Sequence, residues 1–434
     1  MIVQKFGGSS IANPDRIKKV AARVASHRRK GHDLVVVMSA LGNTTDELLE
    51  LAGQITADPS RRELDMLLST GEQISVSLLA MALHELQCAA ISFTGAQGGI
   101  RTDSSYTKAR IVAISTERIR KELKEKKVVI VAGFQGTSAD HEITTLGRGG
   151  SDLTAVALAK ALGADTCEIY TDVEGIYTTD PRLVKTARKI GRISYEEMLE
   201  LASSGAQVMQ SRSIEVAGKF NIPIHVRSSF SKNEGTWIVK EDPSMEEVLI
   251  RGVSLNKNEA KLTLSRVPNR PGVAAMIFKT LADAGINVDM IIQNIGRSSA
   301  TDITFTVPRS DTQSAVRSLK TIARKAGFKG VSEDPNIAKV SVVGIGMRSH
   351  AGVAAAMFSI LAKHKINIEM ISTSEIKISC VVKKDDAEKA VKALHEGFKL
   401  SKRLPPPACR LPAGQAGPGR ARQGRARAGR QWKK

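Results

Sequence analysis

The chain has 434 residues, of which 42% are hydrophobic and 25% are charged, so it is long enough for more than one domain with sizeable apolar cores. No signal-peptide pattern opens the sequence and no apolar run is predicted to span a bilayer, so we expect a cytoplasmic protein that does not enter a membrane. The formal charge of +20 includes eleven Lys and Arg residues between Lys399 and Lys434, and without them 53 basic residues face 44 acidic ones.

The four cysteines have neither the spacing of a zinc site nor that of a disulfide framework. Cys88, Cys167 and Cys380 lie in apolar contexts, and Cys409 lies near the carboxyl end. We therefore expect reduced, structural thiols.

Residues 1 to about 240 alternate short β-branched runs with longer segments of helical period. The runs 34–37, 128–131 and 168–170 are continuously apolar or nearly so, which is typical of strands covered on both faces. Helical patterns are found over 14–30, 62–85 and 152–162, and again after Ser194, where Ser194 and Glu197 fit a capping box. This alternation predicts an α/β fold with a mainly parallel sheet layered between helices, whose ligands lie beyond the carboxyl ends of the strands.

The first candidate site follows the first predicted strand directly. Lys5-Phe6-Gly7-Gly8-Ser9-Ser10 places a cation, free backbone N–H groups and small hydroxyls at one edge of the sheet. That combination suits phosphate, but taken alone the pattern is better explained by an ordinary turn before a helix capped by Asn13. Other segments of the chain strengthen the phosphate interpretation.

Two more loops follow predicted strands with the same kind of chemistry. Ser39 and the segment 42–45 bring hydroxyls and free N–H groups to a helix start. The segment 144–152, Thr-Thr-Leu-Gly-Arg-Gly-Gly-Ser-Asp, places Arg148 among three glycines, where it can clamp a carboxylate or phosphate through two parallel hydrogen bonds. Neither loop fits a Rossmann or P-loop fingerprint. A further loop, 171–182, offers hydroxyls, an aromatic ring and Arg182, which suit a nucleotide.

Taken together, the motifs KFGGSS, MSALGNTTDELL, STGEQIS, TTLGRGGSDLTA and YTDVEGIYTTDPR resemble those of the aspartokinases, of the amino acid kinase family. The resemblance runs from Met1 to about Leu400. It implies a phosphotransferase that uses MgATP to phosphorylate the β-carboxylate of L-aspartate, giving 4-phospho-L-aspartate for lysine, threonine, methionine and diaminopimelate biosynthesis.

A carboxylate is already a nucleophile at neutral pH, so this chemistry requires alignment and charge neutralisation rather than a general base. By resemblance, the catalytic residues are Lys5, Arg148 and Asp152, with no metal ligand assigned. The implied cofactor-binding residues are Lys5, Phe6, Gly7, Gly8, Ser9, Thr171, Asp172, Tyr177 and Arg182. The implied aspartate-binding residues are Ser39, Thr45, Glu72, Arg148 and Ser151, with Arg148 on the α-carboxylate and Glu72 near the α-ammonium. Gln207 stands where many relatives have lysine, so no phosphate role is assigned to it.

The second half contains an internal repeat with an offset of 80 residues. The segment 272–278 recurs at 352–358, and the segment 285–291 recurs at 365–371. Each copy is predicted to form a βαββαβ unit, and the pair resembles the ACT modules of aspartokinases. We therefore predict a catalytic domain over 1–245, ACT modules over 249–330 and 338–398, and a disordered basic tail over 404–434.

The first copy carries the predicted regulatory site. Its loop 267–272 places free amides at a helix start, ready for an effector carboxylate. By resemblance, Asn269, Asn287 and Gln293 bind lysine, with threonine as a co-effector. The resemblance also implies a homo-oligomer, or an α2β2 assembly whose regulatory subunit starts internally at Met245.

Three other hypotheses are considered. A non-catalytic amino-acid sensor is disfavoured by the presence of Lys5, Glu72, Arg148 and Asp152. A nucleic-acid-binding protein is supported by the tail alone, which is expected to be a solvated Pro/Gly/Arg-rich segment. Kinases of the same fold that act on acetylglutamate, glutamate or UMP lack this set of loops joined to paired ACT modules.

Overall fold

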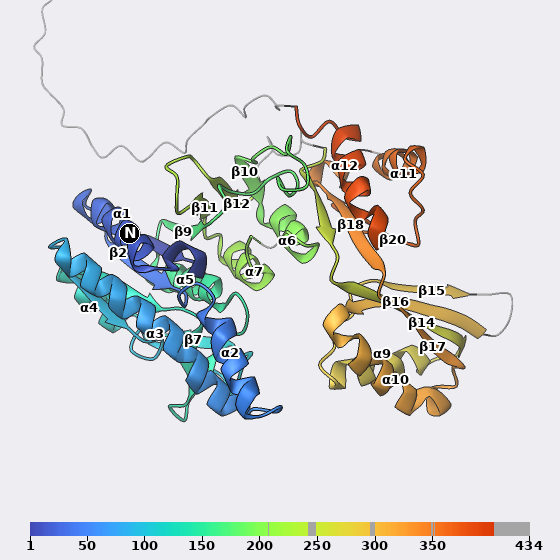
Figure 1. Ribbon diagram of the computed structural model, residues 1–434, viewed down its shortest axis with the longest axis horizontal. Coiled ribbons are helices and arrows are strands. Elements are labelled where there is room, and N and C mark those ends of the chain that lie inside the picture. Colours follow the sequence, from blue (N-terminus) through green and yellow to red (C-terminus); the bar gives the residue numbers. More distant parts are fainter. Residues whose placement is uncertain (207, 242–248, 296–299, 349, 351, 403–434) are drawn as a thin grey trace, which may run out of the picture. The chain divides into compact units, whose positions relative to one another are not determined.

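The computed structural model describes residues 1–206, 208–241, 249–295, 300–348, 350 and 352–402, without the side chains of 294 and 295 (Figure 1). Gln207, Met245, Cys409 and the predicted tail lie outside these residues. The predictions made for them are therefore not addressed by the structure.

The first part of the chain is built on an eight-stranded sheet with the order β10-β12-β11-β9-β1-β2-β6-β3 (Figure 1). Its strands are β1 (Ile2–Phe6), β2 (Leu34–Met38), β3 (Ala90–Phe93), β6 (Val128–Ala132), β9 (Thr166–Thr171), β10 (Arg192–Ser194), β11 (Ile224–Ser228) and β12 (Thr236–Val239). All neighbouring strands pair in parallel except β11 and β12. The predicted, mainly parallel sheet is confirmed, with β1 at its centre between β2 and β9.

Helices cover both faces of this sheet, as the continuous apolar strands indicate. They are α1 (Pro14–Arg29), α3 (Arg61–Glu85), α4 (Glu117–Lys124), α5 (Gly150–Leu162), α6 (Tyr195–Ser203) and α7 (Ser211–Phe220), whereas α2 (Thr44–Ile55) packs on α3. Alternate residues of β2 enter two different cores. Val35 and Val37 pack in the core that contains residues of α4, α5, α6 and α7, while Val36 and Met38 pack in the core that contains residues of α1 and α3.

The predicted helix starts are also confirmed. The Asn13 side chain accepts a hydrogen bond from the Arg16 N–H at 3.0 Å, with Pro14 in the first helical position. At α6 both halves of the capping box between Ser194 and Glu197 are present. A short 3-10 helix, η1 (Gly8–Ile11), precedes α1.

Helix α3 is long and apolar enough to cross a membrane when judged by length and composition alone. Half of its most apolar window is nevertheless buried inside the protein, and the helix packs against α1, α2 and strands of the sheet. It also carries the carboxylates of Asp65 and Glu72 on its buried face. These features are those of a core helix.

A second, smaller sheet lies in the same part of the chain, with the order β5-β4-β7-β8. Its strands are β4 (Ile100–Thr102), β5 (Ile111–Ile114), β7 (Gln135–Thr137) and β8 (Ile143–Thr145). Strand β8 ends just before the glycine-rich segment around Arg148, so this sheet fixes the start of that loop.

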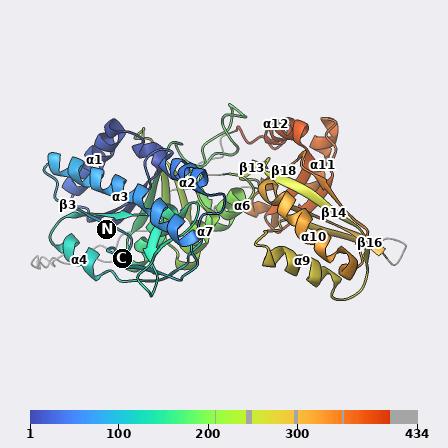
Figure 2. The same ribbon diagram turned by 60° about the horizontal axis from the view of Figure 1, so that its bottom comes forward.

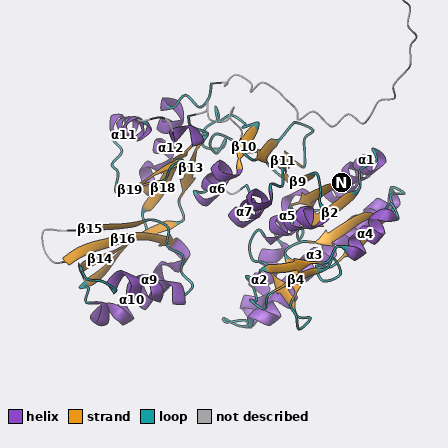
Figure 3. Cartoon of the chain, turned by 180° about the vertical axis from the view of Figure 1, so that it is seen from behind, coloured by secondary structure: helices purple, strands orange, loops and turns teal. Residues whose placement is uncertain are grey.

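The repeat forms two four-stranded sheets with helices. The first copy is a complete βαββαβ unit, comprising β14 (Glu259–Pro268), α9 (Val273–Asp283), β15 (Ile291–Ile295), β16 (Ala300–Pro308), α10 (Thr312–Ala326) and β17 (Gly330–Asp334). Both α9 and α10 pack on one face of its sheet (Figure 3). The short 3-10 helix η2 (Arg309–Asp311) precedes α10.

The sheet of the second copy includes residues predicted from the sequence to belong to the first module. The second copy contains β18 (Ile337–Val343), η3 (Ile345–Arg348), α11 (Val353–Lys363), β19 (Met370–Thr373), β20 (Lys377–Lys383), η4 (Lys384–Asp386) and α12 (Ala387–Gly397). Its fourth strand is β13 (Gly252–Asn256), which lies before the first copy in the sequence and pairs antiparallel with β18 (Figure 2). Residues 252–256 therefore belong to the sheet of the second module, because no strand follows α12 in the described residues to occupy that edge of β18.

The described residues all lie within the larger unit of the chain, Met1–Arg403. The boundaries predicted near 245 and 330 stay predictions, because no division of the larger unit falls there. Within the described residues Cys88, Cys167 and Cys380 are buried, free thiols, as expected.

Candidate active site

The loops after β1 and β2 meet beside the end of β9. The Phe6 carbonyl accepts a hydrogen bond from the Ser39 N–H at 3.1 Å, and the Gly7 N–H donates to the Tyr170 carbonyl at 3.2 Å. Because Ser39 follows β2 and Tyr170 lies at the end of β9, the segment after β1 is held between the loop after β2 and the last residues of β9. The parallel sheet thus brings together two of the four loops that the sequence singled out, those after β1 and β2, beside the end of β9.

The approach of these loops is so close that Gly8 has no room for a side chain. A Cβ at Gly8 would lie 2.8 Å from the carbonyl oxygens of Ala40 and Gly42, both of which are backbone atoms. The Gly42 N–H also donates to the Gly8 carbonyl at 3.1 Å. Glycine is needed here because of the close backbone approach, as expected of a cradle built from main-chain groups.

Lys5 and Asp152 form an ion pair at this edge, with 2.7 Å between Lys5 Nζ and Asp152 Oδ1. Their side chains are 13% and 8% exposed, so the pair is largely removed from solvent. Asp152 lies in the first turn of α5, whose amino end favours negative charge. A Cβ at Gly7 would be 3.4 Å from Lys5 Nζ, which places the ammonium directly beside the glycine turn.

Ser151 is buried next to Asp152, against the loop that follows β6. A Cβ at Gly133 would lie 2.8 Å from Ser151 Oγ. Arg148, three residues earlier, is exposed and makes no hydrogen bond or ion pair within the described part of the chain. Between them, Gly149 has φ = 72°, and a Cβ there would lie 2.6 Å from Gln210 Cβ. The backbone that presents Arg148 is therefore fixed, while its guanidinium is available to a ligand.

Glu72 is buried at the middle of α3, beside the loop after β2. Its Oε1 accepts a hydrogen bond from the Ala40 N–H at 3.1 Å, while its Oε2 is buried and has no hydrogen-bond partner in the described residues. Burial raises the pKa of the carboxyl to about 8. Ser75, one turn further on, donates to the Ser39 carbonyl at 2.7 Å. Glu72 and Ser39 therefore lie together, and Glu72 has an unused acceptor that suits a cationic group.

Thr45 lies in the first turn of α2 and is half-buried. Helix α3 passes close to the loop before it, because a Cβ at Gly71 would lie 2.8 Å from Ala40 Cβ and 3.6 Å from Thr44 Cγ2. The structure thus brings the amino end of α2 to the same region as Glu72, although no contact joins the Thr45 side chain to it.

Asp65 is a positioning residue that the sequence reasoning missed. It is fully buried on α3, two turns before Glu72, and accepts hydrogen bonds from the N–H groups of Thr107 and Thr145 and from Thr145 Oγ1. These bonds fasten the end of β8 to α3 and so anchor the loop of Arg148. The only signal in the sequence is the seven-residue spacing of the two carboxylates, which places them on one helix face but does not distinguish a buried acid from a solvated one.

Tyr177 and Arg182 lie in the loop after β9. Within the described residues, neither makes a hydrogen bond or ion pair with Lys5 or Asp152. Thr171 Oγ1 donates to Asp172 Oδ1 at 3.1 Å. Tyr177 forms an isolated bridge with Lys189. The Arg182 guanidinium pairs with Asp180 of the same loop at 2.8 Å and is highly exposed. Within the described residues the glycine turn is bonded to Tyr170, at the end of β9 just before this loop, and not to the loop 171–182 itself.

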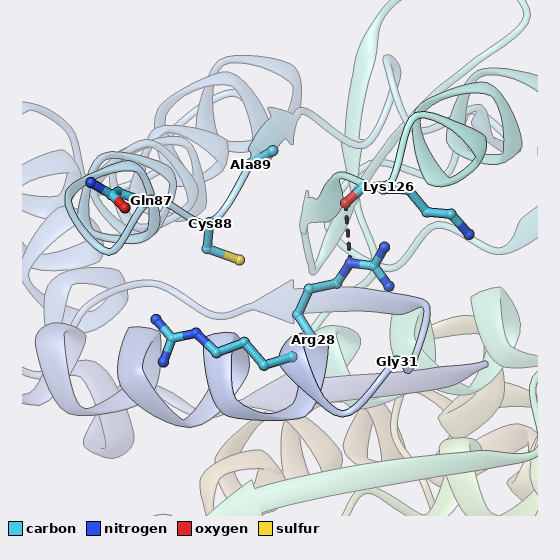
Figure 4. A pocket seen from close by; sticks show the side chains of 7 residues that line it. Arg28, Gly31, Gln87, Cys88, Ala89 and Lys126 are labelled. Atoms are coloured by element: carbon cyan, nitrogen blue, oxygen red, sulfur yellow. Dashed lines mark hydrogen bonds between the residues drawn. The ribbon is translucent and has the colours of Figure 1, made fainter.

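A pocket of about 400 Å³ lies at the opposite edge of the sheet (Figure 4). It is lined by Arg28, Arg29, Gly31, Gln87, Cys88, Ala89 and Lys126. Most of these residues come just before β2, β3 and β6, at the amino ends of the strands. Both arginines are bound to backbone carbonyls, Arg28 to that of Lys126 at 3.1 Å and Arg29 to that of Leu86 at 3.4 Å. The basic lining therefore fastens turns together and is not part of the site at the carboxyl edge.

The residues predicted to bind an effector, Asn269, Asn287 and Gln293, are all exposed. Asn269 precedes α9, whose N-cap Gly272 has φ = 90°, and the equivalent Gly352 in the second copy has φ = 97°. No hydrogen bond joins the three side chains to one another in the described residues. They remain predicted ligand contacts.

Comparison with known proteins identifies the family. The sequence model of the amino acid kinase family matches residues 1–228, and that of the ACT domain matches residues 265–322 and 340–398. The aspartate kinase of Pseudomonas putida is 54% identical over 401 residues, covering 92% of this chain and 98% of the relative. This chain belongs to the aspartokinases of the amino acid kinase family.

Solved structures of aspartokinases share its architecture. That of Escherichia coli aspartokinase III in complex with aspartate and ADP, described as the R-state, has a TM-score of 0.78 at 28% identity and covers 92% of this chain and 99% of that one. The same enzyme with lysine and aspartate, described as the T-state, has a TM-score of 0.70 with the same identity and coverage. The amino acid kinase fold followed by ACT modules is therefore confirmed for this aspartokinase chain.

Proposed function

We propose that this protein transfers the γ-phosphate of ATP to the β-carboxylate of L-aspartate and is inhibited by lysine, threonine or both through its ACT modules. The observation that carries the proposal is the buried Lys5–Asp152 pair at the edge of the sheet where the loops after β1 and β2 meet. A lysine held there by a carboxylate is a fixed cation beside main-chain donors, which suits a transferring phosphoryl group.

The reaction requires little of the protein beyond alignment. The β-carboxylate of aspartate is ionised at neutral pH and attacks the γ-phosphorus without a general base. Lys5 neutralises charge on the phosphoryl oxygens, and Phe6, Gly7, Gly8 and Ser9 line the phosphates. Asp152 holds the Lys5 ammonium in place, so its contribution is orientation at the reacting centre.

The same edge supplies the two groups that an amino acid requires. Glu72 has a buried carboxyl oxygen without a hydrogen-bond partner in the described residues, and in its ionised form this group suits the α-ammonium of aspartate. Arg148, exposed on a rigid glycine loop, suits the α-carboxylate through a bidentate contact. Ser39, Thr45 and Ser151 complete the proposed aspartate site from the ends of β2, α2 and α5.

The nucleotide is placed on the loop after β9, with Thr171, Asp172, Tyr177 and Arg182 as its contacts. Mg²⁺ is proposed to arrive bound to the phosphates of ATP and to water, the usual arrangement for this ion. No group of three or more His, Cys, Asp or Glu side chains arranged to hold a metal occurs in the described residues, so no protein ligand is assigned. When bound, the ion would neutralise charge on the phosphates.

The finer points of regulation and assembly are part of the same proposal. Lysine, with threonine as a co-effector, is placed at Asn269, Asn287 and Gln293. The structure of aspartokinase III with lysine and aspartate, described as the T-state, supports an effector of this kind. The proposed assembly is a homo-oligomer or an α2β2 form with a subunit started at Met245, and the proposed location is the cytoplasm.

The decisive experiment is an aspartyl-hydroxamate assay on the purified chain with MgATP and L-aspartate, with and without lysine and threonine. We expect hydroxamate formation with aspartate and none with glutamate or acetylglutamate, and we expect the effectors to lower the rate. Binding of lysine without any hydroxamate would instead favour the non-catalytic sensor.

A further inference from the structure

One strand of the second ACT module is hydrogen-bonded directly to the loop after β9. The Val253 N–H, in β13, donates to the Thr178 carbonyl at 2.7 Å. A Cβ at Gly252 would lie 2.8 Å from the same carbonyl oxygen, so backbone meets backbone here without intervening side chains. Strand β13 thus belongs to the sheet of the regulatory module and also contacts the proposed nucleotide loop.

The Thr178 side chain makes a second connection to the same module. Its hydroxyl lies 3.0 Å from His395 Nε2, on α12, and accepts a hydrogen bond from the Arg188 N–H at 3.0 Å. Thr178 and His395 are 2% and 1% exposed. Burial and the nearby Arg188 lower the pKa of His395, which favours the neutral ring. In that form Nε2 can accept a hydrogen bond from the Thr178 hydroxyl. Thr178 Oγ1 and His395 Nε2 therefore both have a hydrogen-bond partner.

The chain just after the loop is embedded in the core of that module. Val184 is buried in the apolar cluster that contains Val253 and Leu394, and Leu183 and Ala187 pack against the cluster. The nucleotide loop therefore leads into a segment whose packing depends on β13 and α12. A shift of these two elements cannot occur without moving Thr178, because close-packed cores transmit displacement.

We propose that Thr178 and His395 are positioning residues through which the second ACT module holds the nucleotide loop in its ATP-binding conformation. This inference rests on the proposed function, which places ATP on that loop. Neither residue touches the reacting atoms. They act through Tyr177 and the backbone around it, which are adjacent to Thr178 in the chain.

The test compares variants that differ by one polar atom. Thr178→Val keeps the shape of the side chain but removes the hydroxyl, and Thr178→Ser keeps the hydroxyl. The loss of a buried hydrogen bond typically changes an equilibrium by about five- to tenfold. We expect Thr178→Val to raise the KM for ATP by about that factor and to leave the KM for aspartate within about twofold of the parent value. We expect Thr178→Ser to have the same KM values as the parent.

A second pair of variants tests the histidine independently of Thr178. The amide end of glutamine in His395→Gln reaches the position of Nε2, whereas that of asparagine in His395→Asn reaches only the position of Nδ1. We expect His395→Gln to bind ATP like the parent and His395→Asn to bind it less tightly. This pair decides the matter if Thr178→Val does not fold.

The control is Lys377→Met, which removes an ion pair between the second module and α6. Lys377 Nζ lies 2.7 Å from Glu200 Oε2, so this change also weakens a contact between the ACT module and the kinase part, but away from the nucleotide loop. It should leave the KM for ATP unchanged. If Lys377→Met and Thr178→Val give equal effects, the role of Thr178 is general packing and the proposal is wrong.

The dissociation constant of a fluorescent ATP analogue should be measured alongside turnover for every variant. A parent that binds the analogue but makes no hydroxamate would overturn the proposed function while still testing the positioning role. A parent with full activity, together with folded Thr178→Val and His395→Asn variants that bind ATP unchanged, would overturn the inference alone.

Discussion

Glu72 shows how a single buried carboxyl links stability to pH. Its pKa is raised by burial from an ordinary value of 4.5 to about 8, so between these values the folded chain holds a proton that the unfolded chain has released. The proton held by Glu72 therefore adds to the free energy of unfolding. This stabilising contribution is complete below pH 4.5 and is lost as the pH rises through 8. Each unit of pKa difference corresponds to about 1.4 kcal/mol, so a loss of a few kcal/mol is expected over this range.

Glu72→Gln should therefore flatten the decline in Tm between pH 5 and pH 8, since a neutral amide never ionises. The measurement is a series of thermal unfolding curves for parent and variant at several pH values. All other titrating groups are shared by the two proteins, so parallel Tm profiles would show that Glu72 ionises normally.

In the parent, the KM for aspartate should also fall as pH rises toward 8, because an ionised Glu72 pairs with the ammonium.

Lys5 is the residue on which the proposed chemistry depends most. Lys5→Ala removes the cation and leaves Asp152, only 8% exposed, without its partner. We expect kcat to fall on the order of 100-fold or more, since an electrostatic group at the transferring phosphoryl is lost. Lys18→Ala removes the same charge from the exposed face of α1 and serves as the control. Near-parent turnover in a folded Lys5→Ala protein would remove Lys5 from the site.

At the scale of the element, the meeting of the β1 and β2 loops depends on one glycine. Gly8→Ala places a Cβ 2.8 Å from two backbone carbonyl oxygens, so one of the loops must move. We expect ATP binding and kcat to fall together, because the phosphate cradle and the position of Lys5 are both disturbed. The readouts are kcat and the dissociation constant of ATP.

The matched substitution is Gly53→Ala, in the exposed interior of α2, where a Cβ meets nothing within 4 Å. Alanine is the better helix former by roughly 1 kcal/mol, so this variant should be slightly more stable and fully active. Equal activity in the two alanine variants would show that the close approach at Gly8 is unimportant for the site.

The elements themselves were predictable because their signals are local. Asn13 with Pro14, and Ser194 with Glu197, indicate helix starts within a few residues, and continuous apolar runs indicate strands covered on both faces. The parallel sheet then places the ends of β1, β2 and β9 together. Arg148 and the glycines around it follow from the same logic, since they come directly before a helix.

Pairings between distant segments could not be predicted in this way. The five residues of β13 do not indicate in their sequence that they pair with β18 across a complete intervening module. The contact between Thr178 and His395 joins residues 217 positions apart, and the ligands of Asp65 likewise come from remote strands. Such contacts are decided by tertiary packing, on which short-range patterns carry no information.

At the scale of the whole molecule, two reciprocal ion pairs join the ACT modules. Lys261 of the first module pairs with Glu369 of the second, and Lys339 of the second pairs with Asp289 of the first. Asp289 and Glu369 are equivalent positions in the repeat, separated by the same 80 residues. Asp289 lies two residues after Asn287, so a ligand at the predicted effector site would lie next to a contact between the modules. The second module in turn contacts the loop after β9, which is proposed to bind the nucleotide.

This arrangement predicts that Asn269→Ala weakens inhibition by lysine, or by lysine with threonine, and leaves kcat without effector nearly unchanged. The change removes a proposed effector contact, while Asn269 is exposed and remote in sequence from the kinase loops. Coupling energies between sites are typically ~1–3 kcal/mol, enough to raise the inhibition constant several-fold. Thr373→Ala, at the position in the second module equivalent to Gln293, is the matched variant.

Because coupling is reciprocal, aspartate and ATP should weaken lysine binding to the parent, which calorimetry can measure directly. Superimposable inhibition curves for the parent and Asn269→Ala, with a shifted curve for Thr373→Ala, would move the effector site to the second module.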